Sequence, residues 1–153
     1  RTENLEDKVL TQDIIYVGGG NTKSMLAVWK EWNLHEILLN AYEKGIVMSG
    51  VSAGAICWFD KGITDSYAEE LTIINCLGII KGIACPHFDE EKEREPYVND
   101  VISKEIIKSC ICIEGNCALH IKNNTEYSSI DFGNGKKCFR VYKEHNTLKK
   151  EIL

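Results

Sequence analysis

The stretch Ile46-Val47-Met48-Ser49-Gly50-Val51-Ser52-Ala53-Gly54-Ala55 decides how the rest of this chain is interpreted. Its first residues are apolar strand formers, and a G-x-S-x-G pentapeptide follows them directly. A strand that turns sharply into a helix with serine at the tip is strained, and small neighbours let the backbone turn without clashes. Such a turn lifts the Ser52 hydroxyl out of the sheet and aims a helix N-terminus at the reaction site. The pentapeptide also fits an ordinary strand-to-helix turn in which serine caps the helix.

Composition limits the classes of protein to consider. The 153 residues are 44% hydrophobic and 27% charged, which is ordinary for a globular protein with one core. We therefore treat residues 1–153 as a single domain. The net charge of −5 disfavours a nucleic-acid partner, and no apolar run is long enough to span a membrane. The N-terminal residues are polar and acidic, unlike a signal peptide, so we expect a cytoplasmic protein without a membrane partner. We expect it to be either a monomer or a homodimer.

Seven cysteines are many for this length. Their number is odd, most lie inside apolar stretches, and no pair has the C-x-x-C spacing of zinc or redox sites. We interpret them as free thiols that act as small hydrophobes in a reducing compartment. No other metal-ligand spacing and no P-loop is present, so we expect neither a metal nor another cofactor.

The pattern of apolar runs predicts an α/β fold with a doubly wound, mostly parallel sheet and an antiparallel C-terminal tail. Continuous rather than alternating runs predict central strands that are covered on both faces. The expected strands are 14–17, 46–49, 77–80, 83–85 and 110–113, followed by 117–121, 127–130 and 138–142 in the tail. The expected helices are 22–32, with Thr22 as N-cap, and 35–44, 53–59 and 97–107. Residues 1–12 are expected to be a helix or linker, 61–66 a loop, 69–75 a turn or short strand, and 143–153 frayed.

Four of these strands end in peptides that suggest chemistry. They are Gly18-Gly19-Gly20-Asn21, Gly50–Gly54, Pro86-His87-Phe88 and Glu114-Gly115-Asn116. The carboxyl ends of parallel strands meet at one edge of a sheet, where ligands of such folds bind.

The four peptides supply one candidate for each role in acyl transfer. Ser52 would be the nucleophile, His87 the base that takes its proton, and Glu114 the carboxylate that orients the histidine. The amides of Ala53 and Gly20 would stabilise the negative charge on the attacked carbonyl oxygen. Each residue also has a plainer interpretation: a lone histidine is usually a core or capping residue, and a glutamate in a turn is often only solvated.

These motifs, in this order, make residues 13–145 resemble peptidase family S51, which includes aspartyl dipeptidase (peptidase E) and, more distantly, cyanophycinase. The resemblance implies a glutamine-amidotransferase-like fold and a triad of Ser52, His87 and Glu114. It also implies a small peptide substrate with an N-terminal aspartate. Arg94 matches the position of an arginine that binds the acidic side chain of the substrate, and we assign Asn21 to substrate binding as well.

Two departures from the family pattern leave alternatives open. About two βα units normally precede the strand at Ile14, so we expect a longer N-terminal part, without which one side of a central strand would be exposed. The stretch 61–75 does not match peptidase E closely. A cyanophycinase-like or other hydrolase, or a non-catalytic truncated relative, therefore remains an alternative to a dipeptidase. A cysteine nucleophile is disfavoured, because the turn carries serine and Cys57 falls inside the next expected helix.

Overall fold

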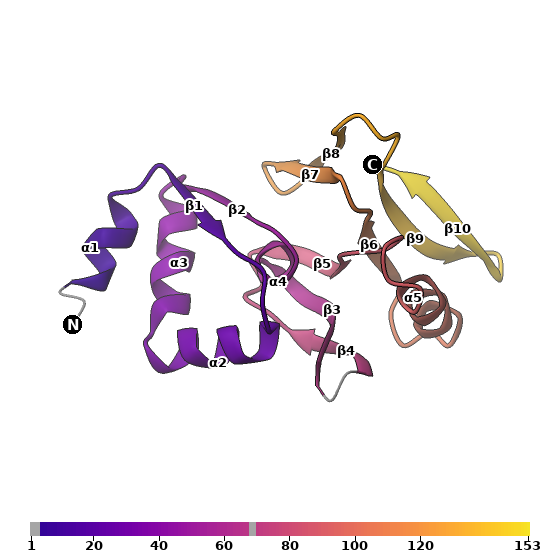
Figure 1. Cartoon of the computed structure of the whole chain (residues 1–153), viewed down its shortest axis with the longest axis horizontal. Helices are drawn as coiled ribbons and strands as arrows, with labels where there is room; N and C mark the ends of the chain where they lie inside the picture. The colour runs from indigo at the N-terminus through magenta and orange to yellow at the C-terminus, as the bar shows by residue number, and fades with distance from the viewer. Residues whose placement is uncertain (1–3, 68–69) are drawn as a thin grey trace. The chain divides into compact units, whose positions relative to one another are not determined.

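The computed structural model describes residues 4–67 and 70–153, which form a mixed α/β fold (Figure 1). The chain separates into two compact units between Ile79 and Ile80. The expectations for residues 1–3 and for Glu69 fall outside the described residues.

The first unit is built on two parallel strands. They are β1 (Ile14–Val17) and β2 (Val47–Gly50), paired so that Val17 lies opposite Gly50. The helices of this unit are α1 (Leu5–Leu10), α2 (Thr22–Glu31), α3 (Leu34–Glu43) and the short α4 (Ala53–Ile56). The predicted parallel pairing is confirmed, and it brings the carboxyl ends of β1 and β2 together.

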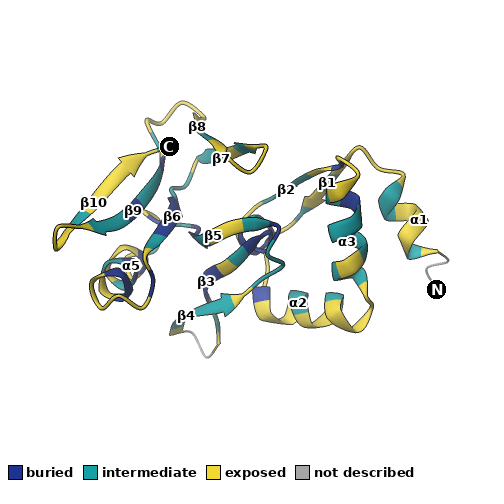
Figure 2. Cartoon of the chain, turned by 180° about the vertical axis from the view of Figure 1, so that it is seen from behind, coloured by how far each residue is buried: buried dark blue, intermediate teal, exposed yellow. Residues whose placement is uncertain are grey.

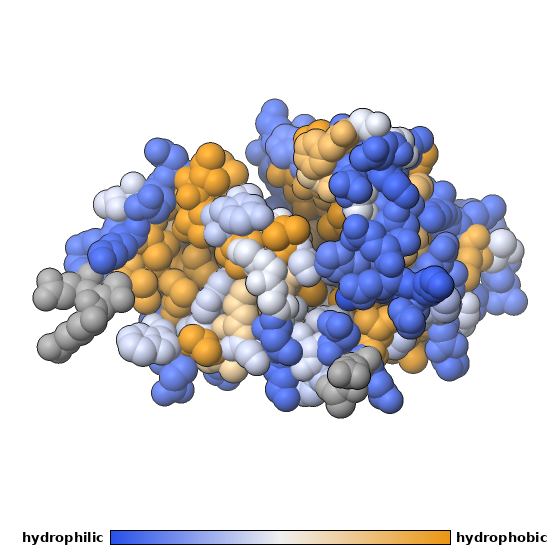
Figure 3. All heavy atoms as spheres, viewed as in Figure 1, coloured by the Kyte–Doolittle hydropathy of each residue, from blue (hydrophilic) through white to orange (hydrophobic). Residues whose placement is uncertain are grey.

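One face of this strand pair is not covered by the described residues. Ile14 and Tyr16 are 62% and 67% exposed, and Val47, the pairing partner of Ile14, is 56% exposed. Figure 3 shows apolar atoms, in orange, gathered over α3 and the β1–β2 pair. The described residues therefore do not supply the coverage on both faces that continuous apolar runs predict, and one side of the strand pair is exposed, as expected for these residues taken alone.

An antiparallel hairpin completes the first unit. Its strands are β3 (Phe59–Tyr67) and β4 (Glu70–Asn75), which pair from Lys61 opposite Asn75. The prediction of a loop at 61–66 is wrong, because pairing with β4 overrides the weak strand propensity of its polar residues and glycine. Helix α4 ends at Ile56, three residues before the end of the predicted helix 53–59. Strand β3 then begins at Phe59.

The second unit is a sheet with one parallel and two antiparallel pairs. Strand β5 (Ile80–Cys85) runs parallel to β6 (Ser109–Ile113), with Cys85 opposite Cys112. Antiparallel to β6 lies β9 (Cys138–Glu144), which in turn pairs with β10 (Thr147–Ile152). The expected separate strand 77–80 is absent from the described residues, since only Ile80 of that stretch lies in a strand.

A separate hairpin and one helix complete the second unit. The hairpin joins β7 (Cys117–Lys122) to β8 (Glu126–Asp131) in antiparallel register. The antiparallel character of the tail is thereby confirmed. Helix α5 (Arg94–Ser103) starts three residues before the predicted 97–107, because Pro96 fits within a first helical turn, where no backbone N–H is needed.

The prediction that residues 143–153 are frayed is wrong. His145 and Asn146 both have positive φ, at 46° and 64°, and they join Glu144 to its pairing partner Thr147. Two residues with positive φ form the tight turn whose twist matches antiparallel strands. The turn thus directs the last residues into β10.

The buried residues, dark blue in Figure 2, are mostly apolar. Among them are Cys57, Cys85, Cys110, Cys112 and Cys138, and all seven cysteines are free thiols. Burial raises the pKa of Cys85 and of Cys138 to about 12, so both remain protonated at neutral pH. Within the described residues no helix is both long and apolar enough to cross a membrane.

Candidate active site

The serine at the end of β2 has an unusual backbone conformation. Ser52 precedes the first residue of α4 with φ 56° and ψ −119°, and its side chain makes no capping hydrogen bond. A positive φ is costly for a residue with a side chain, by about 1–3 kcal/mol, and is typically kept where function needs it. The hydroxyl therefore does not serve as a helix cap, which removes the plainer interpretation of the pentapeptide.

Two glycines let the backbone make this turn. A Cβ atom on Gly50 would lie 2.7 Å from the carbonyl oxygen of Val17, and one on Gly54 would lie 2.7 Å from that of Gly18. Real Cβ atoms do not approach oxygen so closely, so only glycine fits at either position. The turn is held in place by the close passage of β1, through backbone packing rather than through side chains.

The glycine loop after β1 lies beside the serine. A Cβ atom on Gly19 would lie 3.5 Å from Cβ of Ser52 and 3.9 Å from its Oγ. Gly20 has a φ of 150°, and Ala53 is the first residue of α4. Amides at a helix N-terminus have no acceptor within the helix, so the amide of Ala53 is suited to an anionic group. The loop and the turn thus come together within the first unit.

Asn21 has a structural task in this unit. Its Oδ1 accepts a hydrogen bond of 2.9 Å from the amide of Ser24, which makes Asn21 the N-cap of α2. The predicted cap, Thr22, is instead the first helical residue; it is buried, and its Oγ1 lies 3.3 Å from that of Thr64. The amide of Thr22 donates to Oγ of Ser66. These bonds attach the end of the glycine loop to β3.

The histidine lies in the second unit, immediately after β5. The amide of Phe88 donates to the carbonyl of Ile113 at 3.0 Å, so the histidine loop runs beside the end of β6. His87 itself has a φ of 53°. The structure thus brings His87 and Glu114 to the ends of two adjacent parallel strands, as the sequence pattern predicts.

The carboxylate in contact with the imidazole comes from the histidine's own loop. Nδ1 of His87 lies 2.7 Å from Oε2 of Glu90. Oε2 of Glu114 instead accepts a hydrogen bond of 2.9 Å from the amide of Lys137. Sequence reasoning did not single out Glu90, because it lies in a charge run; its spacing of three residues from His87 was the available signal.

A second acidic side chain ties the histidine loop to the Glu114 turn. Oδ1 of Asp89 accepts a hydrogen bond of 2.7 Å from the amide of Gly115, and its Oδ2 pairs with Nζ of Lys136. Burial raises the pKa of Asp89, but the bonds from Lys136 and Gly115 outweigh this and hold it below its ordinary value. Asp89 is therefore a carboxylate at neutral pH.

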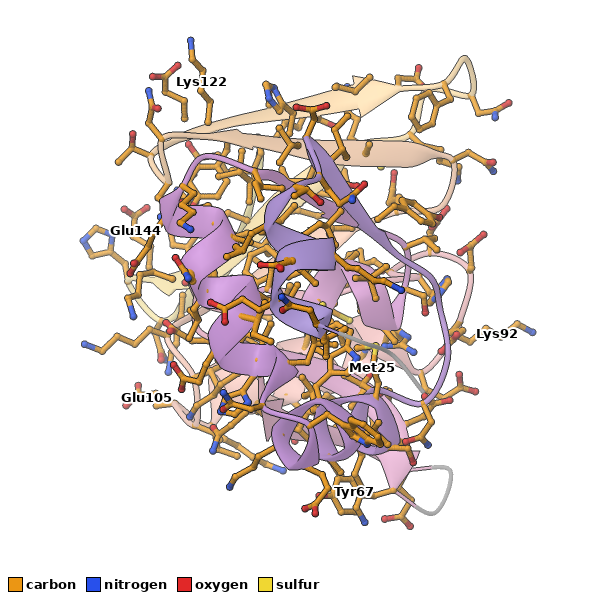
Figure 4. The ribbon with its side chains drawn as sticks, turned by 90° about the vertical axis from the view of Figure 1, so that its left-hand side faces the viewer. Met25, Tyr67, Lys92, Glu105, Lys122 and Glu144 are labelled. Atoms are coloured by element: carbon orange, nitrogen blue, oxygen red, sulfur yellow. The ribbon has the colours of Figure 1, made fainter. Side chains whose placement is uncertain are left out.

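Arg94 is almost fully buried, with only 3% of its surface exposed, at the start of α5. Its Nε donates to Oε2 of Glu91 at 2.7 Å. Burial opposes its charge, yet the hydrogen bonds and charge interactions with Glu91 and Cys85 together outweigh this and raise the pKa of the guanidinium. Lys92, from the same charge run, points into solvent (Figure 4). The charge run as a whole is thus not a solvated face.

A shallow pocket of about 660 Å³ lies elsewhere in the first unit, between α2 and the β3–β4 hairpin. Lys23 contributes to it, with Nζ 3.8 Å from the ring centre of Tyr67, which Figure 4 labels. No group of three potential metal ligands occurs among residues 4–67 and 70–153.

The chain is similar to known proteins in sequence and in fold. The family model described as peptidase family S51 matches residues 1–128. An uncharacterized peptidase of Bacillus subtilis (strain 168), YgaJ, is 43% identical over 140 residues, which cover 92% of this chain and 60% of the relative. The chain is also similar to the crystal structure of a Listeria monocytogenes EGD-e protein that carries the provisional name peptidase E. That match has a TM-score of 0.63 and 21% identity, over 85% of this chain and 66% of the other.

Proposed function

Because the chain belongs to peptidase family S51, we propose that it is a serine-type exopeptidase that forms an acyl-enzyme on Ser52. The observation that carries the proposal is the positive φ of Ser52, held by two glycines beside the glycine loop. The chain spans 60% of the length of its Bacillus relative, so peptidase activity of this chain is a proposal.

The proposed reaction is acyl transfer in two steps. His87 takes the proton of Ser52 as Oγ bonds to the scissile carbonyl carbon, and the amides of Gly20 and Ala53 receive the developing oxyanion. The carbon–nitrogen bond then breaks, and the leaving amine receives the proton from His87. Water, activated by His87, releases the acyl group and regenerates Ser52. This requires His87 Nε2 within about 2.6–3.2 Å of Ser52 Oγ in the working enzyme.

For the substrate, we propose a small peptide with an N-terminal aspartate. Arg94 is the residue proposed to bind the acidic side chain, because its planar fork can hold a carboxylate bidentately. Its bond to Glu91 means that a substrate carboxylate would compete with that glutamate. Asn21, although it caps α2, ends the glycine loop and remains a proposed substrate contact. The seven free thiols support the proposal of a cytoplasmic location. The proposed reaction uses neither a metal nor a nucleotide.

The test is Ser52→Ala, measured by hydrolysis of Asp-Leu and by labelling with a fluorophosphonate probe. We expect hydrolysis to fall by at least about 10³-fold and labelling to vanish, because the nucleophile is removed. A panel of Glu-Leu, Ala-Leu and β-aspartyl peptides separates the dipeptidase from a cyanophycinase-like hydrolase. Full activity of Ser52→Ala would exclude the serine mechanism, and an unlabelled wild-type protein would favour a non-catalytic relative.

A further inference from the structure

The histidine loop contains a carboxylate that the family resemblance does not assign. The structure points to Glu90 as the positioning residue for His87: its carboxylate holds the imidazole by Nδ1, which leaves Nε2 as the proton acceptor. This inference rests on the proposed function, in which His87 is the base. It concerns how the base is held and does not change the reaction.

The 2.7 Å contact determines the tautomer of the imidazole. An ionised carboxylate can only accept, so Nδ1 of His87 must carry the proton that it donates to Oε2 of Glu90. In the neutral ring the other nitrogen, Nε2, then keeps its lone pair, which is the state that a general base needs. Glu90 therefore sets both the orientation and the protonation pattern of the ring.

An exposed ion pair three residues apart would ordinarily contribute little, so the question is whether Glu90 is held in place. A Cβ atom on Gly115 would lie 2.8 Å from Cγ of Glu90 and still closer to its carboxylate. The glutamate therefore packs flat against the backbone of the turn that follows β6. Gly115 is a residue of the Glu114-Gly115-Asn116 motif, and here it makes room for Glu90.

The backbone under Glu90 is fixed by separate bonds. The amides of Glu90 and Glu91 both donate to the carbonyl of His87 at 3.1 Å, which closes a tight turn. The amide of Gly115 donates to Asp89, which also pairs with Lys136. Backbone hydrogen bonds close the turn, and Asp89 attaches it to Gly115. The side chains of Glu90 and His87 are therefore held next to each other by a backbone that is already ordered. This preorganisation separates the pair from an ordinary surface contact.

Glu114, the alternative carboxylate, is engaged elsewhere. Its Oε2 accepts from the amide of Lys137, and its own amide donates to the carbonyl of Lys137 at 3.3 Å. These two bonds connect the end of β6 to the start of β9. The contacts of Glu114 thus indicate a structural role, whereas the contact of Glu90 is with the imidazole itself.

The experiment compares Glu90→Ala with Glu114→Ala and with Glu93→Ala. Glu93 is exposed and is the N-cap residue of α5, where its side chain makes no capping hydrogen bond. Glu93→Ala removes the same charge as Glu90→Ala and is therefore the matched control. The first readout is nitrogen-15 NMR of the imidazole of His87, which reports the tautomer whether or not the protein is active. We expect the Nδ1–H form to dominate in the wild type, in Glu93→Ala and in Glu114→Ala, and to be lost in Glu90→Ala.

The second readout is the rate of fluorophosphonate labelling of Ser52 across pH. We expect Glu90→Ala to slow labelling by about tenfold to hundredfold, less than the loss of about 10⁴ for a fully buried triad carboxylate, because Glu90 is about half exposed. Gly115→Ala, which displaces the carboxylate without removing it, should slow labelling as well.

An Nδ1–H form that persists in Glu90→Ala but disappears in Glu114→Ala would overturn the inference and assign the role to Glu114. Wild-type labelling rates in Glu90→Ala would also overturn it. If Glu90→Ala fails to fold, labelling of Ser52 in Gly115→Ala is the test instead: slower labelling than in the wild type would support the role of Glu90, and an unchanged rate would overturn it. Absence of labelling in the wild type would count against the proposed function alone, since the NMR comparison still tests the contact.

Discussion

The serine turn of the first unit and the histidine loop of the second hold their functional side chains by different means. Around Ser52 the constraint is steric: Gly50 and Gly54 leave no room for a Cβ atom beside the backbone of β1. Around His87 the constraint is a set of charged side chains, Glu90 and Asp89 with Lys136. A steric constraint is indifferent to pH and salt, whereas a charged one depends on both. The histidine is therefore the adjustable partner of the proposed pair.

The largest effect should come from the steric side. Gly54→Ala places a Cβ atom against the carbonyls of Val17 and Gly18, which are backbone and cannot move aside. We expect a loss of about 3 kcal/mol or more in the free energy of unfolding, measured by urea denaturation. The control is Gly18→Ala, where a Cβ atom would meet nothing within 4 Å, and which should change stability by less than about 0.5 kcal/mol. Similar losses in the two variants would show that the turn is not sterically constrained.

An intermediate effect should reveal the strain at the nucleophile. Ser52→Gly and Ser52→Ala both lack the hydroxyl, but only glycine adopts a φ of 56° without cost. We expect Ser52→Gly to be more stable than Ser52→Ala by about 1 kcal/mol, after allowance for the greater freedom of glycine in the unfolded chain. Both variants should be inactive. Equal midpoints in thermal denaturation would mean that the turn relaxes when the hydroxyl is removed.

The smallest effect should come from the charged side and should depend on pH. The pKa of Asp89 is lowered in the folded protein, so its stabilising contribution is present above the unfolded-state pKa and is lost as the pH falls through the folded one. We expect Asp89→Asn to lose no more than about 1 kcal/mol at pH 7, because solvent screens the pair, and the difference to shrink as the pH falls below about 4. Asp65→Asn, at an exposed position of β3, is the control, and denaturation at pH 7 and pH 3 measures both. A difference that is the same at both pH values would contradict the charged constraint.

Most elements that depend on local residue patterns could be predicted from the sequence. The strands predicted at 14–17 and 110–113, which the structure has at 14–17 and 109–113, follow from local apolar runs, and the glycine loop and the turn at Ser52 follow from glycine spacing. Prediction failed where pairing with another strand decides: β3 has weak local strand propensity and forms because β4 pairs with it. It also failed at His145-Asn146, whose positive φ values are not signalled by glycine.

For the candidate site, the residue types were predicted from the sequence, but one partner was not. Glu114 was assigned by motif order, whereas the contact with His87 is made by Glu90, three residues away in a run of charges. Runs of charge are usually solvated, so composition alone hides a residue whose role depends on the turn beneath it. The burial of Arg94 in the same run was hidden for the same reason.

The turn at Ser52 has a practical consequence for identifying the natural substrate. Its shape is set by Gly50, Gly54 and the backbone of β1, so we expect that the atom attached to Cβ of residue 52 can be exchanged without reshaping the turn. With 2,3-diaminopropionate at this position, the attacking atom of the proposed reaction becomes an amine, and a transferred acyl group would be held as an amide. Amides hydrolyse far more slowly than esters, so under the proposed mechanism a protein incubated in a cell extract would retain the acyl group, and its mass would report the substrate residue.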